Sequence, residues 1–497
     1  MTLAAHLPAL QVALPLAVAP ICALLTWRST AWAIATLTSW FCLAISVAMF
    51  IQVRDHGVFS YAMGGWSAPW GIEFRIDALN ALMLLLVTAV NAVVISFARL
   101  SIQQEIEAWR APMFYAAWLL CVAGLLGIAI TGDAFNMFVF LEISSLASYI
   151  LVSCGKDRRA LVASYKYLIM GSIGATFFLI GVGLLYMVTG TLNLYDISAR
   201  LPNADFSRPV LAAAGFITLG LALKFAMFPL HLWMPNAYTF APHAVSALLA
   251  ATSTKISIYV LLRFEFIVFQ PNLDHHDIQF SSFMIPLSIL AIFVGAIAAV
   301  YQGNIKRVLA YSSVGQIGYI LLGVALLTTT GLTGGILHLF NHGLAKAVLF
   351  MAVGCLYFRY RTCKIDRLAG CGRDMPWTMA AFVVGGMSLI GVPFTAGFIS
   401  KLYLVKGLLE QGALGILLTI LFLVGSLIAV IYIWRIIEVA YFRPRAEGVA
   451  PVKEAPLSLL VPTWGMALAN IYFGIDPSLP LGLATQSAEQ LILGKLL

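Results

Sequence analysis

The chain has 497 residues, of which 61% are hydrophobic and 10% are charged, and its formal net charge is +8. Soluble domains usually carry about 25% charged residues, so the composition excludes a soluble globular protein and predicts an all-α polytopic membrane protein. The positive charge does not indicate binding to nucleic acid, because the basic residues lie in short loops between apolar segments, as membrane topology requires.

A helix that spans the bilayer needs about 20 apolar residues, and the chain contains about fourteen such runs. They lie near residues 8–27, 30–52, 76–98, 112–131, 133–153, 162–189, 209–229, 243–268, 282–302, 306–328, 332–358, 377–400, 413–441 and 456–474. Prolines interrupt the seventh and the twelfth runs, which predicts broken helices there. The first run has neither a basic leader nor a small-residue cleavage site, so we expect a retained helix rather than a signal peptide.

Lysine and arginine divide the loops into two classes. The class that the positive-inside rule assigns to the cytoplasm contains Arg28, Arg99, Arg110, Lys156, Arg158, Arg159, Lys306, Arg307, Arg359, Arg361, Lys364, Arg367, Arg373, Arg443, Arg445 and Lys453. The other class contains mainly Arg54, Arg75, Arg200, Arg208 and Lys406. In the cell (inner) membrane, fourteen spans then place both termini outside. The Trp-rich segment 61–72 is expected to form a short outer hairpin at the interface.

The fifth run contains one acid, Glu142, within the apolar stretch 135–151. A carboxylate at bilayer depth costs roughly 2.5–3.5 kcal/mol on insertion scales. Such a residue indicates a proton or ion pathway with a basic partner nearby, although a structural ion pair that locks helix packing is the alternative. The candidate partners, all within apolar runs, are Lys224, Lys255, Lys346 and Lys401.

Two of these lysines lie in the seventh and eighth runs. Lys224 precedes Pro229 by five residues, and the proline leaves a backbone carbonyl without its usual donor. A broken helix offers other hydrogen-bond partners to the ammonium group, and burial disfavours its charged form. The alternative for Lys224 is a side chain that extends to the interface. Lys255 follows Ser253 and Thr254, which predict a polar path.

His338, His342 and Lys346 recur at four-residue spacing, which places them on one face of a helix. Because histidine changes charge near neutral pH, the stripe predicts a proton relay. A metal-binding histidine pair is the alternative, but no acidic third ligand lies nearby in the sequence. Either histidine could also be a structural residue whose ring nitrogens are satisfied.

The twelfth run resembles the seventh, because it combines Lys401 with Pro393. The two runs are five spans apart, and an odd spacing reverses the direction of the chain. This pattern predicts two inverted repeats with broken helices at the site. A position of Lys401 near one membrane surface is the alternative. Farther on, Arg435 and Glu438 are three residues apart and are expected to form a structural pair.

No motif predicts a cofactor or a metal. The seven cysteines include no CxxC pair, and no phosphate loop, dinucleotide fingerprint or nucleophile elbow is present. Gly-x-Gly patterns lie within apolar helices, where small residues allow close packing.

Five motifs resemble the antiporter-like subunits shared by respiratory complex I and the Mrp-type cation/proton antiporters. They are TGDAFNMFVFLE (131–142), KFAMFPLHLWMPNA (224–237), APHAVSALLAATSTKISIYVLLR (241–263), GNIKRVLAYSSVGQIGYI (303–320) and GVPFTAGFISK (391–401). Within this superfamily, the segments GGWSAPWGI (64–72), GDAFNMFVFLE (132–142) and TGTLNL (189–194) are most similar to the Mrp D-type protein. The chain departs from many relatives at Asn236, where an aspartate is frequent.

This resemblance implies a division of the chain into four parts. Helices one to three would occupy residues 1–110, a first repeat of helices four to eight residues 111–270, and a second repeat of helices nine to thirteen residues 281–441. The C-terminal helix fourteen would lie within residues 442–497.

The resemblance also implies roles for five of the ionisable residues. Glu142 and Lys224 would form a pair, Lys255 and His338 would continue the relay, and Lys401 would be the outlet. The implied function is proton translocation within a multisubunit Na⁺(K⁺)/H⁺ antiporter built from other hydrophobic subunits. The alternative is a proton-pumping subunit of a complex I-like NADH dehydrogenase or a membrane-bound hydrogenase. Neither reading requires a cofactor in this chain.

Overall fold

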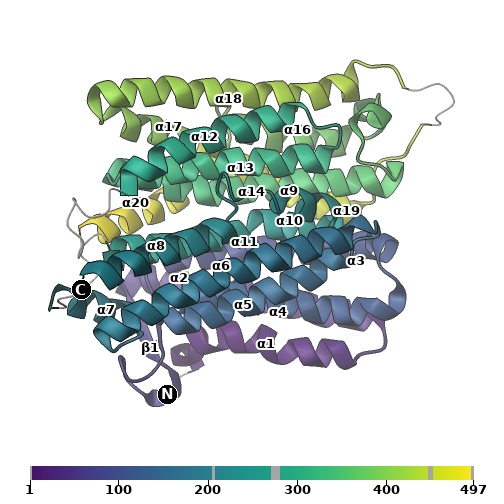
Figure 1. Cartoon of the computed structure of the whole chain (residues 1–497). Coiled ribbons are helices and arrows are strands. Elements are labelled where there is room, and N and C mark those ends of the chain that lie inside the picture. The colour runs from purple at the N-terminus through teal and green to yellow at the C-terminus, as the bar shows by residue number, and fades with distance from the viewer. Residues whose placement is uncertain (1–2, 204–206, 270–279, 446–450, 494–497) are drawn as a thin grey trace.

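The computed structural model describes residues 3–203, 207–269, 280–445 and 451–493. These residues form a bundle of long helices that run side by side between the two ends of the molecule (Figure 1). The first helices in chain order are α1 (Leu7–Leu24), α2 (Arg28–His56), α3 (Ala78–Glu105), α4 (Ala111–Ile130), α5 (Ala134–Ser153), α6 (Arg159–Thr189) and the short α7 (Leu194–Arg200).

The count of fourteen spans is confirmed. Among the described residues, twelve helical segments are long and apolar enough to cross a membrane. The two other expected spans, the seventh and the twelfth, are each divided into two helices, as the prolines predict. The seventh consists of α8 (Ser207–Lys224) and α9 (Met234–Phe240), and the twelfth of α16 (Pro376–Ile390) and α17 (Ala396–Leu409).

Local chemistry explains both breaks. After α8 the backbone turns at Ala226, whose φ is 58°, and the indole N–H of Trp233 donates to the Leu223 carbonyl at 3.0 Å. This bond satisfies one of the carbonyls that the end of a helix leaves free. After α16 the chain turns at Gly391, whose φ of 91° is a conformation that glycine adopts without strain.

A third break, in the eighth span, was not predicted from the sequence. The span consists of α10 (His243–Ala251), α11 (Ser253–Arg263) and η5 (Phe264–Phe269), and it is interrupted at Thr252, with φ −123° and ψ −54°. The Thr252 hydroxyl donates to the Leu248 carbonyl at 2.7 Å. Threonine side chains that bond backward in this way compete with the regular helical ladder.

The spans form two sets of five that run in opposite directions, as the inverted-repeat prediction requires. The first set is α4, α5, α6, α8–α9 and α10–α11. The second is α12 (Phe280–Val300), α13 (Ile305–Ala325), α14 (Thr329–Tyr360), α16–α17 and α18 (Gly412–Tyr441). Helix α10 packs on α14 and α9 packs on α13, so the sets meet at these helices. The expected boundary near residues 270–281 falls almost entirely outside the described residues.

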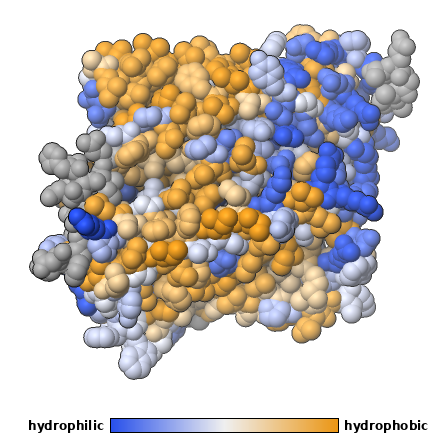
Figure 2. Space-filling view, in the orientation of Figure 1, coloured by the Kyte–Doolittle hydropathy of each residue, from blue (hydrophilic) through white to orange (hydrophobic). Residues whose placement is uncertain are grey.

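The two ends of the bundle differ. At one end, β1 (Phe59–Ala62) and β2 (Glu73–Ile76) form an antiparallel hairpin in which Phe59 lies opposite Ile76. Both chain ends also lie at this hairpin end (Figure 1). Figure 2 shows an apolar band across the middle and a concentration of hydrophilic side chains at the opposite end. That basic end contains the loops 154–159, 359–373 and 443–445.

The C-terminal part contains one helix more than expected. Helix α19 (Leu457–Ile475) is followed by α20 (Ser478–Ile492), which packs against α14 and α3. Gly474, at the end of α19, lies against the break between α16 and α17, because a Cβ atom there would be 2.5 Å from the Phe394 carbonyl oxygen. The expected C-terminal span is thus present as α19, and the shorter α20 follows it. Pro477 marks the junction, and the run after it was too weakly apolar to be counted as a helix.

Candidate functional site

Glu142 and Lys224 form an ion pair between α5 and α8. The Lys224 Nζ atom is 3.0 Å from the Glu142 Oε1 atom and donates to the Ser145 hydroxyl at 2.8 Å. Lys224 is the last residue of α8, so the break after it lets the side chain reach across to α5. The Lys224 side chain is 4% exposed and that of Glu142 is 23% exposed. The pair is therefore open to the surface of the bundle on its acidic side.

Lys255 is completely buried on α11, and its side chain bonds to a carbonyl at the break that precedes this helix. Its Nζ atom donates to the Ala250 carbonyl at 2.5 Å and contacts the Thr254 hydroxyl at 3.3 Å. The interruption at Thr252 supplies the free carbonyl. The acceptors of Lys255 are thus neutral oxygens, in contrast to the carboxylate that faces Lys224.

Helix α14 presents His338, His342 and Lys346 on one buried face, as their spacing indicates. Lys346 donates to the Leu309 carbonyl and to the Ser312 hydroxyl, both at 2.6 Å. The two imidazole rings stack, with centroids 6.1 Å apart. Both ring nitrogens of His342 are buried without a hydrogen-bond partner, and Lys255 and Lys346 lie close enough to act on this ring electrostatically.

His338 links α14 to α17 and α13. Its Nδ1 atom is 2.9 Å from the Ser400 hydroxyl, and its Nε2 atom is 2.8 Å from the Gln316 side-chain oxygen. Ser400 also lies 3.0 Å from the Gly397 carbonyl. The serine hydroxyl has one hydrogen and can point it in either direction. It donates to a neutral His338, and it accepts from a charged His338 while donating to Gly397.

Lys401 lies at the break of the twelfth span. It is the last member of a set of ionisable residues that we call the buried row: Glu142, Lys224, Lys255, His338, His342, Lys346 and Lys401. Its Nζ atom donates to the carbonyls of Leu389 and Ile390 at 3.0 and 2.9 Å and to the Ser426 hydroxyl at 3.0 Å. The Gln316 side-chain nitrogen donates to the same Leu389 carbonyl at 3.4 Å. Lys401 and His338 are thus connected through one carbonyl and one amide side chain.

Six of the seven residues singled out in the sequence are buried, and Glu142 is partly exposed. Three of the lysines, Lys255, Lys346 and Lys401, have no carboxylate partner among the described residues. A buried ammonium that is surrounded by neutral oxygens is stabilised less than one paired with a carboxylate. The charged forms of these three lysines are therefore stabilised less than that of Lys224, which Glu142 faces.

Sequence reasoning missed the neutral residues that hydrogen-bond to the buried row. Gln316, Ser400 and Ser145 were not identified, since serine and glutamine are common in membrane helices and their spacing gives no distinctive pattern. A weak signal existed: Ser400 directly precedes Lys401, and Gln316 lies within the motif 303–320.

Two other buried ionic contacts lie outside the row. Arg263 forms a bidentate pair with Asp77 at 2.7 Å and donates to Asn80 at 2.6 Å. At the basic end, the His243 Nδ1 atom is 3.0 Å from Glu105. In the described part of the chain, no three histidine, cysteine or acidic side chains come together in a way that could hold a metal ion.

The chain is similar to several known membrane proteins. Residues 131–429 match a family model described as NADH:quinone oxidoreductase/Mrp antiporter, transmembrane part. The chain is 39% identical to the N-type subunit of the NADH-quinone oxidoreductase of Desulforudis audaxviator, over 95% of this chain and 96% of that protein. It is 30% identical to the D-type subunit of the Na⁺/H⁺ antiporter of Bacillus subtilis, over 90% of each. A protein in the structure of the Mrp complex from Dietzia sp. superposes with a TM-score of 0.90 at 28% identity, over 99% of this chain and 98% of that one.

Proposed function

Because the chain belongs to the NADH:quinone oxidoreductase/Mrp antiporter membrane family, as an antiporter-type subunit, we propose that it translocates protons within a multisubunit Na⁺(K⁺)/H⁺ antiporter. Its partners would be other hydrophobic subunits in the plasma membrane, with both termini outside. The observation that carries the proposal is the buried row from Glu142 to Lys401. Apolar packing alone would stabilise the bundle without these residues, and each ionisable group within the membrane lowers the stability of the inserted protein.

The row suggests a sequence of proton transfers. Glu142 stabilises the protonated form of Lys224, and separation of the pair would release a proton toward Lys255. His342 and His338, whose rings stack on α14, would continue the transfer. Lys401 would exchange the proton with one side of the membrane. The Ser400 hydroxyl supports this role of His338, because it provides a partner for Nδ1 in both protonation states.

The Glu142→Ala substitution tests the proposal. We expect it to abolish cation-driven proton movement in membrane vesicles, because Lys224 loses the carboxylate 3.0 Å away that stabilises its charge. The complex should still assemble, since Glu142 lies partly at the surface. Glu107→Ala is the matched control, because Glu107 makes only an exposed contact with Arg110. Normal antiport in an assembled Glu142→Ala complex would refute the pathway.

The 39% identity to a quinone oxidoreductase subunit favours a second candidate. In it, the same row would serve as the pump module of a redox complex, such as a complex I-like NADH dehydrogenase or a membrane-bound hydrogenase. The electron transfer would belong to other subunits. Purification of the native complex separates the two candidates. Iron–sulfur subunits that co-purify would support the redox assembly, and small hydrophobic subunits alone would support the antiporter.

A further inference from the structure

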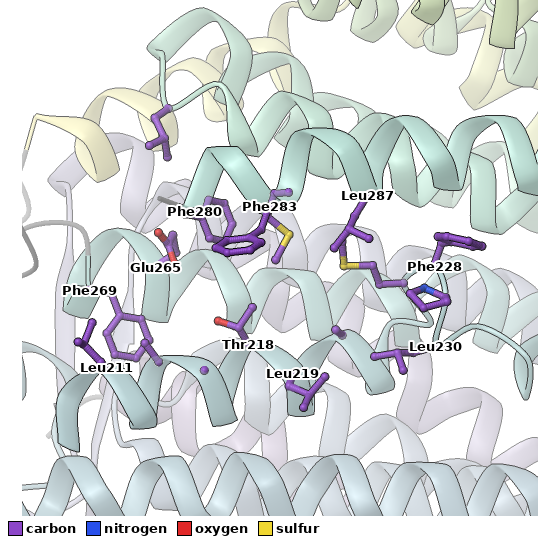
Figure 3. A pocket seen from close by; sticks show the side chains of 17 residues that line it. Leu211, Thr218, Leu219, Phe228, Leu230, Glu265, Phe269, Phe280, Phe283 and Leu287 are labelled. Atoms are coloured by element: carbon purple, nitrogen blue, oxygen red, sulfur yellow. The ribbon is translucent and has the colours of Figure 1, made fainter. Parts of the chain in front are cut away.

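A groove with a volume of about 640 Å³ lies between α8 and α12 and opens at the surface of the bundle, where Leu219 and Phe283 are exposed. Figure 3 shows Phe269 and Phe280 at one end of the groove and Phe228 and Leu230 at the other. The first pair lies toward the hairpin end, and the second belongs to the break in the seventh span. The groove therefore extends from near one membrane surface into the interior of the bilayer.

The lining contains one charged side chain, Glu265 of η5. It is 7% exposed, and in the part of the chain that the structure describes it has neither an ion pair nor a hydrogen bond. The nearby Arg263 donates its hydrogen bonds to Asp77 and Asn80 and not to Glu265. Figure 3 shows the Glu265 carboxylate beside Phe269 and Phe280, at the end of the groove near the surface. A buried carboxylate without a donor takes up a proton, and a cationic hydrogen-bond donor from outside the chain would instead stabilise its charged form.

The shape restricts what can occupy the groove. A helix is about 10–12 Å wide with its side chains, so a partner helix could cover the opening but could not fill the space. Most of the lining is leucine, phenylalanine and methionine, so water finds polar side chains only at Glu265 and Thr218 and does not fill the rest of the space. A flexible hydrocarbon chain fits both the shape and the lining, and the surrounding medium supplies it.

From these observations we infer that the groove binds one acyl chain of a phospholipid whose headgroup carries a primary ammonium, of the phosphatidylethanolamine class. Glu265 accepts hydrogen bonds from that ammonium. Glu265 belongs to η5, which packs on the short helix α7 at the hairpin end of the bundle, so the carboxylate lies near the expected headgroup region. A choline headgroup offers no N–H donor, and an anionic headgroup is repelled. The inference is independent of the transport mechanism.

The test is lipid retention by the full-length chain in nanodiscs with equal amounts of phosphatidylethanolamine and phosphatidylcholine, measured by native mass spectrometry. We expect the wild type to retain the ethanolamine lipid about tenfold over the choline lipid, since a charge-assisted hydrogen bond contributes about 1.5–3 kcal/mol. Glu265→Gln should bring this ratio close to one while lipid remains bound. Equal retention of the two lipids by the wild type would overturn the inference.

A second variant tests the groove itself. A Cβ atom at Gly215, which lines the groove, would meet no atom within 4 Å, so Gly215→Leu places its side chain in the groove without a backbone clash. We expect it to lose one retained lipid per chain. Gly183→Leu is the matched control, because Gly183 is equally unobstructed and lies on α6, outside the groove. Unchanged retention in Gly215→Leu, or equal loss in both variants, would count against the site.

Discussion

His338 is held so that it can gain or lose a proton without leaving its Nδ1 atom unpaired, and Ser400 makes this possible. In Ser400→Ala, the Nδ1 atom of His338 has no partner in either protonation state, and the charged state, whose N–H is left without an acceptor, is destabilised more, by about 1–3 kcal/mol. We therefore expect proton transport in vesicles to slow by about tenfold or more. Ser288→Ala is the control, because the Ser288 hydroxyl is buried without a partner. Equal rates in the two variants would show that Ser400 has no part in the transfer.

The pair formed by Asp77 and Arg263 illustrates the opposite case, a buried ion pair that stabilises the fold. Both side chains are less than 5% exposed, and Asp77 also caps α3 through the Asn80 backbone N–H at 3.0 Å. Asp77→Ala leaves Arg263 buried without a counter-charge, so we expect it to lower the free energy of unfolding by about 3–5 kcal/mol. Thermal unfolding of the purified chain measures this change. Wild-type stability in the variant would mean that Arg263 is stabilised without Asp77.

Individual contacts were the least predictable part of the molecule. The expected pair between Arg435 and Glu438 is wrong: Arg435 donates to the carbonyls of Val300 and Gln302, and Glu438 contacts Arg443 at 3.3 Å. A spacing of three residues allows such a pair, but the carbonyls at the end of α12 offer Arg435 better partners. The cost of burying Glu142 could be read from the sequence, whereas partners such as Gln316 depend on how distant helices pack.

At the scale of elements, the junction of α19 and α20 supports the break in the twelfth span. A Cβ atom at Gly474 would lie 2.5 Å from backbone atoms of Phe394 and Thr395. Relief of this clash requires a shift of the backbone itself, since no flexible side chain can move away. We expect Gly474→Ala to destabilise the protein by about 1–3 kcal/mol and to slow transport, because the loop beside Lys401 must shift. Gly465→Ala on the same helix is the control, since its Cβ would meet no atom within 4 Å. Identical melting temperatures in the two variants would contradict this role of Gly474.

The elements themselves followed from the sequence wherever a strong local signal was present. Apolar length located the spans, and Pro229 and Pro393 located two of the breaks. The break at Thr252 could not be predicted, because no proline or glycine marks it and the interruption depends on side-chain bonds. Helix α20 was missed because it is too short and too polar to register as a span, although it buries one face against α14 and α3.

At the scale of the whole molecule, the uneven distribution of basic residues predicts its orientation. The positive-inside rule places the basic end in the cytoplasm and the hairpin outside. In intact cells, a membrane-impermeant maleimide should label Trp66→Cys in the exposed hairpin region and should not label Arg158→Cys until the cells are opened. The chain without an introduced cysteine is the control, since its seven native thiols are buried or half-buried. Labelling of Arg158→Cys in intact cells would show that the orientation is the reverse of the predicted one.

The position of the buried row within the bundle has an electrical consequence. Glu142, Lys255 and Lys346 lie near the middle of the spans Ala134–Ser153, His243–Phe269 and Thr329–Tyr360. On the proposed pathway, a proton that passes between them moves in the plane of the membrane, perpendicular to the field. Moving one charge through the full membrane potential involves about 2.3 kcal/mol per 100 mV, and this work is confined to the steps that connect the row with water. Voltage therefore acts on proton uptake and release, while transfer along the row is insensitive to it.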